Sequence, residues 1–342
     1  MGLFKQSSQP ISHERPKRER KRIEVGLINN MADQALKVTE RQFETLLAEA
    51  ADDFDLRLRI FSLNGTPRSA FAREYIAASY EPASAVLRSD LHALIFTGAQ
   101  PQADGLNEEP YWGELVELIE WAKLNTASTI LSCLAAHAAV LHLDGIQRRP
   151  LAEKCTGVFA FTVKRTHALM GRKGEARSIP HSRYNGLLES ELEEAGYSVL
   201  NSSAAHGVDT FTKSFGSQFV FLQGHPEYYA NSLAREYRRD MELYLRRQTE
   251  RKPARPRGYF GTRAEAELCA LERRAYDDRA SVPIDDLSVI VSSAPAEAAW
   301  RSSAVSFYRN WFEMILTAIG HGRARSPRTE TLELASHQYD RR

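Results

Sequence analysis

Residues 126–143, TASTILSCLAAHAAVLHL, join a short apolar run to an alanine-rich segment, and Cys133 stands at the junction. The first part is short and rich in β-branched residues, which is typical of a buried strand, and residues 134–143 suit a helix. A strand that leads directly into a helix indicates the unit from which parallel sheets are built. The sequence therefore predicts that Cys133 lies on the turn at the carboxyl end of a strand.

The chain before this unit alternates between the same two patterns. Apolar runs predict strands at 23–29, 54–63 and 91–97, and helical periodicity appears at 37–50 and 111–124. Such alternation predicts an α/β fold with a doubly wound, mostly parallel sheet that helices cover on both faces.

The second half of the chain departs from this alternation. Short strands separated by turn residues are expected to extend the sheet or to form an antiparallel flap, at 157–163, 198–202, 208–212 and 219–222. Added C-terminal helices are expected at 230–247, 264–276 and 296–319.

The composition is that of an ordinary globular protein. Among the 342 residues, Lys plus Arg number 45 and Asp plus Glu number 44, so no net charge favours nucleic acid or a membrane surface as the partner. No apolar run reaches the length of about 18 residues that a membrane span needs. Three cysteines cannot form a disulfide framework, so a cytoplasmic location is expected. Residues 1–21 are expected to form a flexible basic arm, 22–320 a single domain and 321–342 a loose C-terminal tail.

Cys133 is a candidate nucleophile because of this predicted position. Ligands of parallel sheets bind at the carboxyl ends of the strands, and the amides at a helix N-terminus stabilise a thiolate. The backbone N–H of Leu134 would then form half of an oxyanion hole. A single cysteine beside apolar residues is more often a packed core residue, so the hypothesis needs a second observation.

Residues 219–228, FVFLQGHPEY, supply that observation. His225 follows an apolar strand and is therefore expected at the same edge of the sheet as Cys133. Glu227 can reach back to the imidazole, orient it and stabilise its charged form. The three residues together predict a Cys-His-Glu triad for nucleophilic catalysis.

The strand-Cys-helix unit followed by His-Pro-Glu resembles the class I glutamine amidotransferase fold, a flavodoxin-like architecture. More specifically, the chain resembles the homoserine O-acyltransferase (homoserine transsuccinylase) family of methionine biosynthesis. The matching motifs occur in the family's order between residues 23 and 320. They include GLINNM (26–31), TERQF (39–43), STILSC (128–133), PHSRY (180–184), GHPEY (224–228) and REYRRD (235–240).

The resemblance implies a ping-pong acyl transfer in which acyl-CoA is a co-substrate and no cofactor is needed. Cys133 would take the acyl group as a thioester, His225 would act as the general base, and Glu227 would orient His225. The ten histidines show no metal-ligand spacing, so no metal site is predicted.

The resemblance also implies how the acceptor is held. Lys154, Ser182 and Arg239 match positions at which the family contacts its substrate. Cationic side chains suit the carboxylate of an amino acid, and Arg can bind it with two hydrogen bonds. The expected partners are therefore homoserine and acyl-CoA, without nucleic acid or membrane, and the family implies a homodimer.

Two positions depart from the family's pattern. His137 replaces a Gln that the family usually has close after the nucleophile, either as a donor in the pocket wall or as a packed core histidine. Gln102 stands at the position that separates acyl donors, where Gly goes with succinyl-CoA and Glu with acetyl-CoA. Because Gln is as bulky as Glu but uncharged, the donor stays open, with succinyl favoured since no charge opposes it.

Three alternatives stay open. Serine differs from homoserine by one methylene, worth only ~1–3 kcal/mol in a pocket, so a serine O-acyltransferase of cysteine biosynthesis is possible. A glutamine amidotransferase or another hydrolase would use the same fold, although the G-x-C-x-G turn of amidotransferases is absent around Cys133. A non-catalytic relative would have no need of a complete triad.

Overall fold

The computed structural model describes residues 21–52, 54–99, 101–295 and 297–321, and within them eight strands form one sheet. In spatial order the strands are β3 (Glu81–Pro82), β2 (Asp55–Ser62), β1 (Arg22–Ile28), β4 (Ala93–Phe96), β5 (Ser128–Ser132), β12 (Ser217–Leu222), β11 (Thr210–Phe215) and β8 (Ser198–Val199). Neighbours from β3 to β12 pair in parallel, and β11 pairs antiparallel with both β12 and β8. The prediction of a mostly parallel sheet is therefore confirmed.

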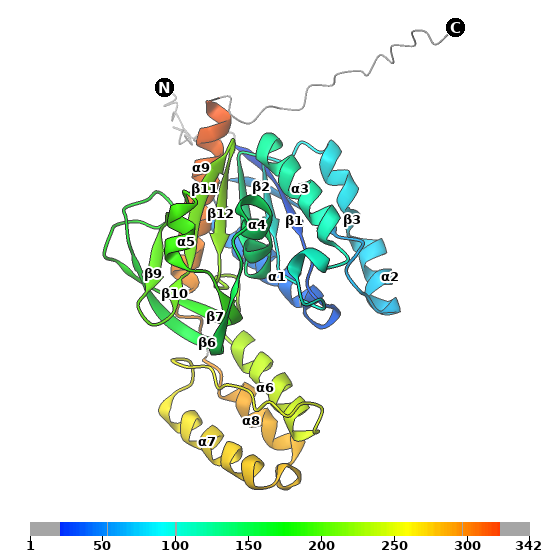
Figure 1. The fold of residues 1–342 in the computed structure, drawn as a ribbon, viewed down its shortest axis with the longest axis vertical. Helices are drawn as coiled ribbons and strands as arrows, with labels where there is room; N and C mark the ends of the chain where they lie inside the picture. Colours follow the sequence, from blue (N-terminus) through cyan, green and yellow to red (C-terminus); the bar gives the residue numbers. More distant parts are fainter. Residues whose placement is uncertain (1–20, 53, 100, 296, 322–342) are drawn as a thin grey trace, which may run out of the picture.

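Helices cover both faces of this sheet (Figure 1). On one face lie α1 (Asp33–Ala50) and α9 (Arg301–Gly320), and on the other lie α3 (Trp112–Asn125) and α4 (Leu134–Asp144). Strand β1 shows why both faces need cover: Leu27 packs with the α1 and α9 side chains, whereas the next residue, Ile28, packs with those of α3 and α4. Each such side chain contributes about 1.5–3 kcal/mol when it is fully buried. The doubly wound arrangement agrees with the prediction, and three further helices, α2 (Ala70–Ser79), α5 (Glu189–Glu194) and α8 (Ser288–Ser292), were not predicted.

A second, antiparallel sheet lies beside the first one. Its order is β10 (Gly207–Val208), β9 (Asn201–Ser203), β6 (Arg149–Val163) and β7 (Ala176–Gly186). The predicted strand at 157–163 is only the end of β6, and β7 was not predicted because its sequence, ARSIPHSRYNG, is polar and contains a proline. The hairpin matters for function, since the carbonyl of Pro180 in β7 accepts the backbone N–H of His225 at 2.8 Å.

A separate layer of helices extends beyond β6 and β7 (Figure 1). It contains α6 (Ser232–Leu245), α7 (Thr262–Asp277) and α8 (Ser288–Ser292), which share an apolar core of their own. Helices α6 and α7 match their predictions, and the helix expected at 296–319 begins at Arg301, with residue 296 outside the described ranges.

The ends of the chain are covered by the structure only in part. Residues 1–20 and 322–342, which hold nearly all of the predicted arm and tail, lie outside the described ranges. None of the helices within those ranges is both long and apolar enough to cross a membrane.

Candidate active site

Cys133 occupies a strained turn between β5 and α4. Its backbone angles are φ 53° and ψ −113°, a conformation that residues other than glycine rarely adopt outside functional sites. Its N–H donates to the carbonyl of Leu222 at 2.7 Å, which ties the turn to the end of β12. Cys133 thus lies on the turn at the carboxyl end of β5, as the sequence predicted, and a sharp turn of this kind suits the presentation of a nucleophile.

The amide of Leu134 lies open beside this turn. In the part of the chain that the structure describes, this N–H has no hydrogen-bond acceptor, as expected for the first residue of a helix. Gly98, just after β4, keeps it accessible, because a Cβ there would lie 3.1 Å from the Leu134 nitrogen. The amide is therefore free to stabilise negative charge that develops on a substrate oxygen.

His225 and Glu227 form a buried pair next to Cys133. The Nδ1 of His225 lies 2.8 Å from the Oε1 of Glu227, and the two residues are only 8% and 3% exposed. Burial disfavours the charged imidazole, but the charges of Cys133 and Glu227, and hydrogen bonds to both side chains, hold the pKa of His225 well above its usual range. The structure thus brings the three residues of the predicted triad into one chain of contacts.

Tyr228 and Glu236 extend this chain, and the sequence reasoning missed both roles. The Tyr228 ring stacks on the His225 imidazole with centroids 4.3 Å apart and planes at 15°. Its hydroxyl donates to the Oε1 of Glu236 at 2.5 Å. The signal for Glu236 was its place in REYRRD, three residues before Arg239, because residues at this spacing share one face of a helix.

The three residues expected to contact the substrate gather around two carboxylates of α6. The hydroxyl of Ser182 donates to the Oε2 of Glu236 at 2.5 Å. The Nζ of Lys154 lies 3.1 Å from Asp240 and 4.0 Å from Glu236. Arg239 also pairs with Asp240, at 2.7 Å. We call this set of five residues the α6 cluster; its two cations and two carboxylates balance in charge.

Gln102 lies on the loop between β4 and α3, held by a buried carboxylate. Its backbone N–H donates to the Oε1 of Glu109 at 2.7 Å. Glu109 is 3% exposed, and its Oε2 has no hydrogen-bond partner in the described ranges. The structure gives no hydrogen bond to the Gln102 side chain, so only the position of its backbone is fixed here.

Arg148 is a third residue that the sequence reasoning missed. It follows α4 and forms no ion pair within 4.0 Å with any described residue. Burial lowers its pKa, and the negative charges of Glu109 and Cys133 oppose that effect, which places all three groups in one electrostatic neighbourhood. A half-buried cation with no ion-pair partner among the described residues, in the neighbourhood of Cys133, is suited to binding an anionic group.

His137 is a packed core histidine, which settles the two readings that the sequence left open. It is 3% exposed, and its Nε2 lies 2.9 Å from the Oε1 of Gln223. Burial lowers the pKa of His137 to about 4, so its imidazole is neutral at physiological pH.

The other two cysteines take no part in the contacts described above. Burial raises the pKa of Cys155, whose Sγ lies 3.9 Å from the Nδ1 of His206, and Cys269 lies on α7. Both are free thiols, as is Cys133. Among the described residues, no group of three or more His, Cys, Asp or Glu side chains is arranged to hold a metal ion.

Comparison with known proteins gives one family. The family model described as homoserine O-succinyltransferase matches residues 3–319. The chain is 41% identical over 300 residues to a homoserine O-succinyltransferase of Methylorubrum extorquens, covering 88% of this chain and 89% of that protein. It is 43% identical to proteins of the same name from Rhodopseudomonas palustris and Bradyrhizobium japonicum. These matches cover 84% and 88% of this chain and 87% and 93% of theirs.

Solved structures show a more distant likeness. A glutamine amidotransferase from Thermotoga maritima matches with a TM-score of 0.47 and 12% identity, covering 86% of this chain and 98% of that chain. The family model and the three relatives each span most of the chain. The chain therefore belongs to the homoserine O-succinyltransferase family.

Proposed function

We propose that this protein transfers an acyl group from acyl-CoA to the hydroxyl of L-homoserine, through a thioester on Cys133, in methionine biosynthesis. The observation that carries the proposal is the buried His225–Glu227 pair beside Cys133: the imidazole stacks on Tyr228, which donates to Glu236 of the α6 cluster. This arrangement supports a nucleophile and its base next to a charge-balanced group of side chains that suits a zwitterionic amino acid.

In the first half-reaction, Cys133 attacks the thioester carbonyl of acyl-CoA. His225 takes the thiol proton, and Glu227 stabilises the resulting imidazolium, in keeping with the raised pKa of His225. The oxyanion that forms lies against the Leu134 N–H. The carbon–sulfur bond to CoA then breaks, His225 returns the proton to the leaving CoA sulfur, and the acyl group stays on Cys133.

In the second half-reaction, homoserine takes the place of CoA. His225 removes the proton of the homoserine hydroxyl, and the oxygen attacks the acyl carbonyl on Cys133. Collapse of the tetrahedral intermediate breaks the bond to sulfur, and the proton passes from His225 back to Cys133. The products are the O-acyl ester and the free thiol.

The α6 cluster binds the amino-acid part of the acceptor in this proposal. The homoserine carboxylate pairs with the guanidinium of Arg239, which is half exposed, and with Lys154. Its ammonium pairs with Glu236, which accepts only two hydrogen bonds although a carboxylate has about four acceptor positions. Ser182 donates a hydrogen bond to the Oε2 of Glu236 and so holds this carboxylate at the oxygen that Tyr228 does not contact.

Succinyl-CoA is the donor that we favour over acetyl-CoA. A succinyl group carries a distal carboxylate, and Arg148 is an unpaired cation close to Cys133. Gln102 brings no negative charge against that carboxylate. The relatives named above carry the succinyl name, which also supports this choice.

Release of free CoA by the purified protein tests the proposal. Acetyl-CoA and succinyl-CoA are each combined with homoserine, with serine and with no acceptor. Release that requires homoserine and prefers succinyl-CoA is expected. Release that requires serine points to the serine O-acyltransferase instead, and no release, together with glutaminase activity, points to an amidotransferase.

The homodimeric state, the cytoplasmic location and the lack of nucleic-acid and membrane partners remain part of this proposal. Analytical ultracentrifugation of the full chain tests the first of these. A protein that sediments at twice the mass of one chain is expected.

A further inference from the structure

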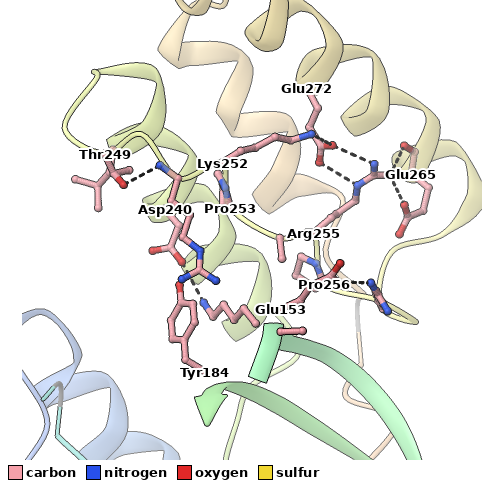
Figure 2. A pocket seen from close by; sticks show the side chains of 16 residues that line it. Glu153, Tyr184, Asp240, Thr249, Lys252, Pro253, Arg255, Pro256, Glu265 and Glu272 are labelled. Carbon is pink, nitrogen blue, oxygen red and sulfur yellow. Dashed lines mark hydrogen bonds and ion pairs between the residues drawn. The ribbon is translucent and has the colours of Figure 1, made fainter. Parts of the chain in front are cut away.

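A cavity adjoins the α6 cluster. Its volume is about 660 Å³, and an extended segment, residues 249–257, forms much of its wall between β6, α6 and α7 (Figure 2). The side chains of Lys154 and Asp240 line it as well, and both belong to the α6 cluster. We call this cavity the basic pocket, because five cationic side chains line it against four acidic ones.

Most charges of the basic pocket are already paired. On the α7 side, Glu272 accepts from Lys252 and Arg255, both at 3.0 Å, and Arg255 also pairs with Glu265. These contacts neutralise the acidic groups of α7 and fix the shape of the extended segment (Figure 2). The acidic side chains that line the pocket are therefore no barrier to an anion that binds elsewhere in it.

Arg251 is the exception among these cations. Within the described part of the chain it has no carboxylate within 4.0 Å, and its guanidinium lies 4.8 Å from the centre of the Tyr184 ring. The Nζ of Lys154 lies 5.3 Å from the same ring centre. Arg257 is also accessible to a ligand, since its pair with Glu153 leaves both side chains more than two-thirds exposed. Exposed pairs of this kind are worth only about 0–1 kcal/mol, so an anion can displace Glu153.

The pocket lies at a position that suits one end of a long ligand. Lys154 and Asp240 form both a wall of the basic pocket and a part of the α6 cluster, which the contact chain joins to Cys133. An acyl-CoA molecule has its thioester at one end and its phosphates and adenine at the other, with a flexible arm between them. The uncommitted Arg251 and the 46% exposed Tyr184 offer a phosphate ligand and an aromatic surface.

We propose that the basic pocket binds the phosphate-bearing nucleotide end of the acyl-CoA donor, with Arg251 as its principal phosphate ligand. This inference rests on the proposed function, because it assumes that acyl-CoA is the donor. Arg257 supplies further positive charge along the same segment. Because the pocket recognises the nucleotide and not the acyl group, it contributes to donor affinity and leaves the chemistry at Cys133 unchanged.

Two donors of different length test this assignment. One is succinyl-CoA, and the other is the succinyl thioester of N-acetylcysteamine, which lacks the nucleotide. We expect Arg251→Gln to raise KM for succinyl-CoA roughly tenfold, the effect of one lost charge-assisted hydrogen bond, and to leave the short thioester's kcat/KM unchanged. Arg263→Gln is the matched control, because Arg263 lies on α7, pairs with Glu267 and is 94% exposed outside the pocket. It should alter neither donor.

Direct binding separates this inference from the proposed function. Equilibrium dialysis should show that Arg251→Gln weakens binding of CoA roughly tenfold and does not change binding of pantetheine, which lacks the phosphates. Equal losses for both ligands, or an unchanged KM for succinyl-CoA, would overturn the assignment of the pocket. A wild-type protein that binds CoA through Arg251 but never releases it from succinyl-CoA would instead overturn the proposed function and leave the pocket standing.

Discussion

Replacing Glu236 by Gln tests how the acceptor is recognised. The substitution keeps the shape of the side chain and removes the negative charge; the amide oxygen still accepts from one of the two hydroxyls, of Tyr228 and Ser182, and the other hydroxyl must turn to accept from the amide NH2. If Glu236 binds the homoserine ammonium, a charge-assisted hydrogen bond of about 1.5–3 kcal/mol becomes a neutral one of about 1 kcal/mol. The expected loss of about 0.5–2 kcal/mol lowers kcat/KM for homoserine by roughly 2- to 30-fold.

A ping-pong reaction allows this effect to be assigned to one half. The value of kcat/KM for homoserine reports only on the second half-reaction, and the value for succinyl-CoA reports only on the first. In Glu236→Gln, kcat/KM for homoserine should fall, and kcat/KM for succinyl-CoA should stay within about twofold of the wild type, as measured by free-thiol release. Glu242→Gln on the same helix is the matched control, because Glu242 pairs with Arg246 and takes no part in the α6 cluster.

Two results would refute this reasoning. An unchanged kcat/KM for homoserine would mean that the ammonium is not bound at Glu236. An equal fall in both values would mean that Glu236 acts through Tyr228 on the position of His225, since the Tyr228 ring packs on that imidazole.

Three further predictions concern the nucleophile, the donor and stability. Cys133→Ala and His225→Ala should each abolish CoA release. Glu227→Ala should keep some activity, lower than that of the wild type by roughly 10²- to 10⁴-fold, because Glu227 orients the base and does not react. Unchanged CoA release in Cys133→Ala would exclude the covalent route. Arg148→Met should lower kcat/KM for succinyl-CoA by about tenfold or more and leave acetyl-CoA nearly unaffected, since only succinyl has a distal carboxylate to pair with; equal losses with both donors would argue against that pairing. His137 has a folded-state pKa of about 4, below its unfolded value of about 6.5, so the unfolded chain binds more protons between these values and stability is lost as pH falls through that window. Between pH 7 and pH 4, urea unfolding should therefore show that the wild type loses on the order of 3 kcal/mol more of its free energy of unfolding than His137→Gln does. Parallel pH profiles of the free energy of unfolding for the two proteins would contradict this.

The sequence was sufficient for the parallel part of the fold because burial on both faces leaves a clear pattern there. Strand β5 is a continuous run of buried residues, and the helices on either side of the sheet carry apolar faces. The same physics placed Cys133 and His225 at one edge, since each follows a strand of a parallel pair. The fold and the positions of the candidate site residues were thus predictable from the same segments.

The hairpin of β6 and β7 was predicted poorly because its partners are polar. Strand β7 places His181 and Arg183 in buried positions, where Arg183 donates a hydrogen bond to His181 and Asp209 lies 3.3 Å from the His181 ring. Such pairs depend on contacts between segments far apart in the chain, which a local pattern does not carry.

The assembly of the α6 cluster was unpredictable for the same reason. Lys154, Ser182 and Arg239 were expected to contact substrate from the resemblance alone, and only the fold shows that Glu236 and Asp240 join them. A charged residue on an exposed helix looks like a solvated face until its partners are known.

The most direct test of the central claim is the intact mass of the protein after incubation with succinyl-CoA and no acceptor. The account predicts a mass increase of one succinyl group, located on Cys133 by peptide mapping, absent in Cys133→Ala and removed when homoserine is added. An unmodified Cys133 in a protein that still transfers the acyl group to homoserine, or an adduct that homoserine does not discharge, would contradict it.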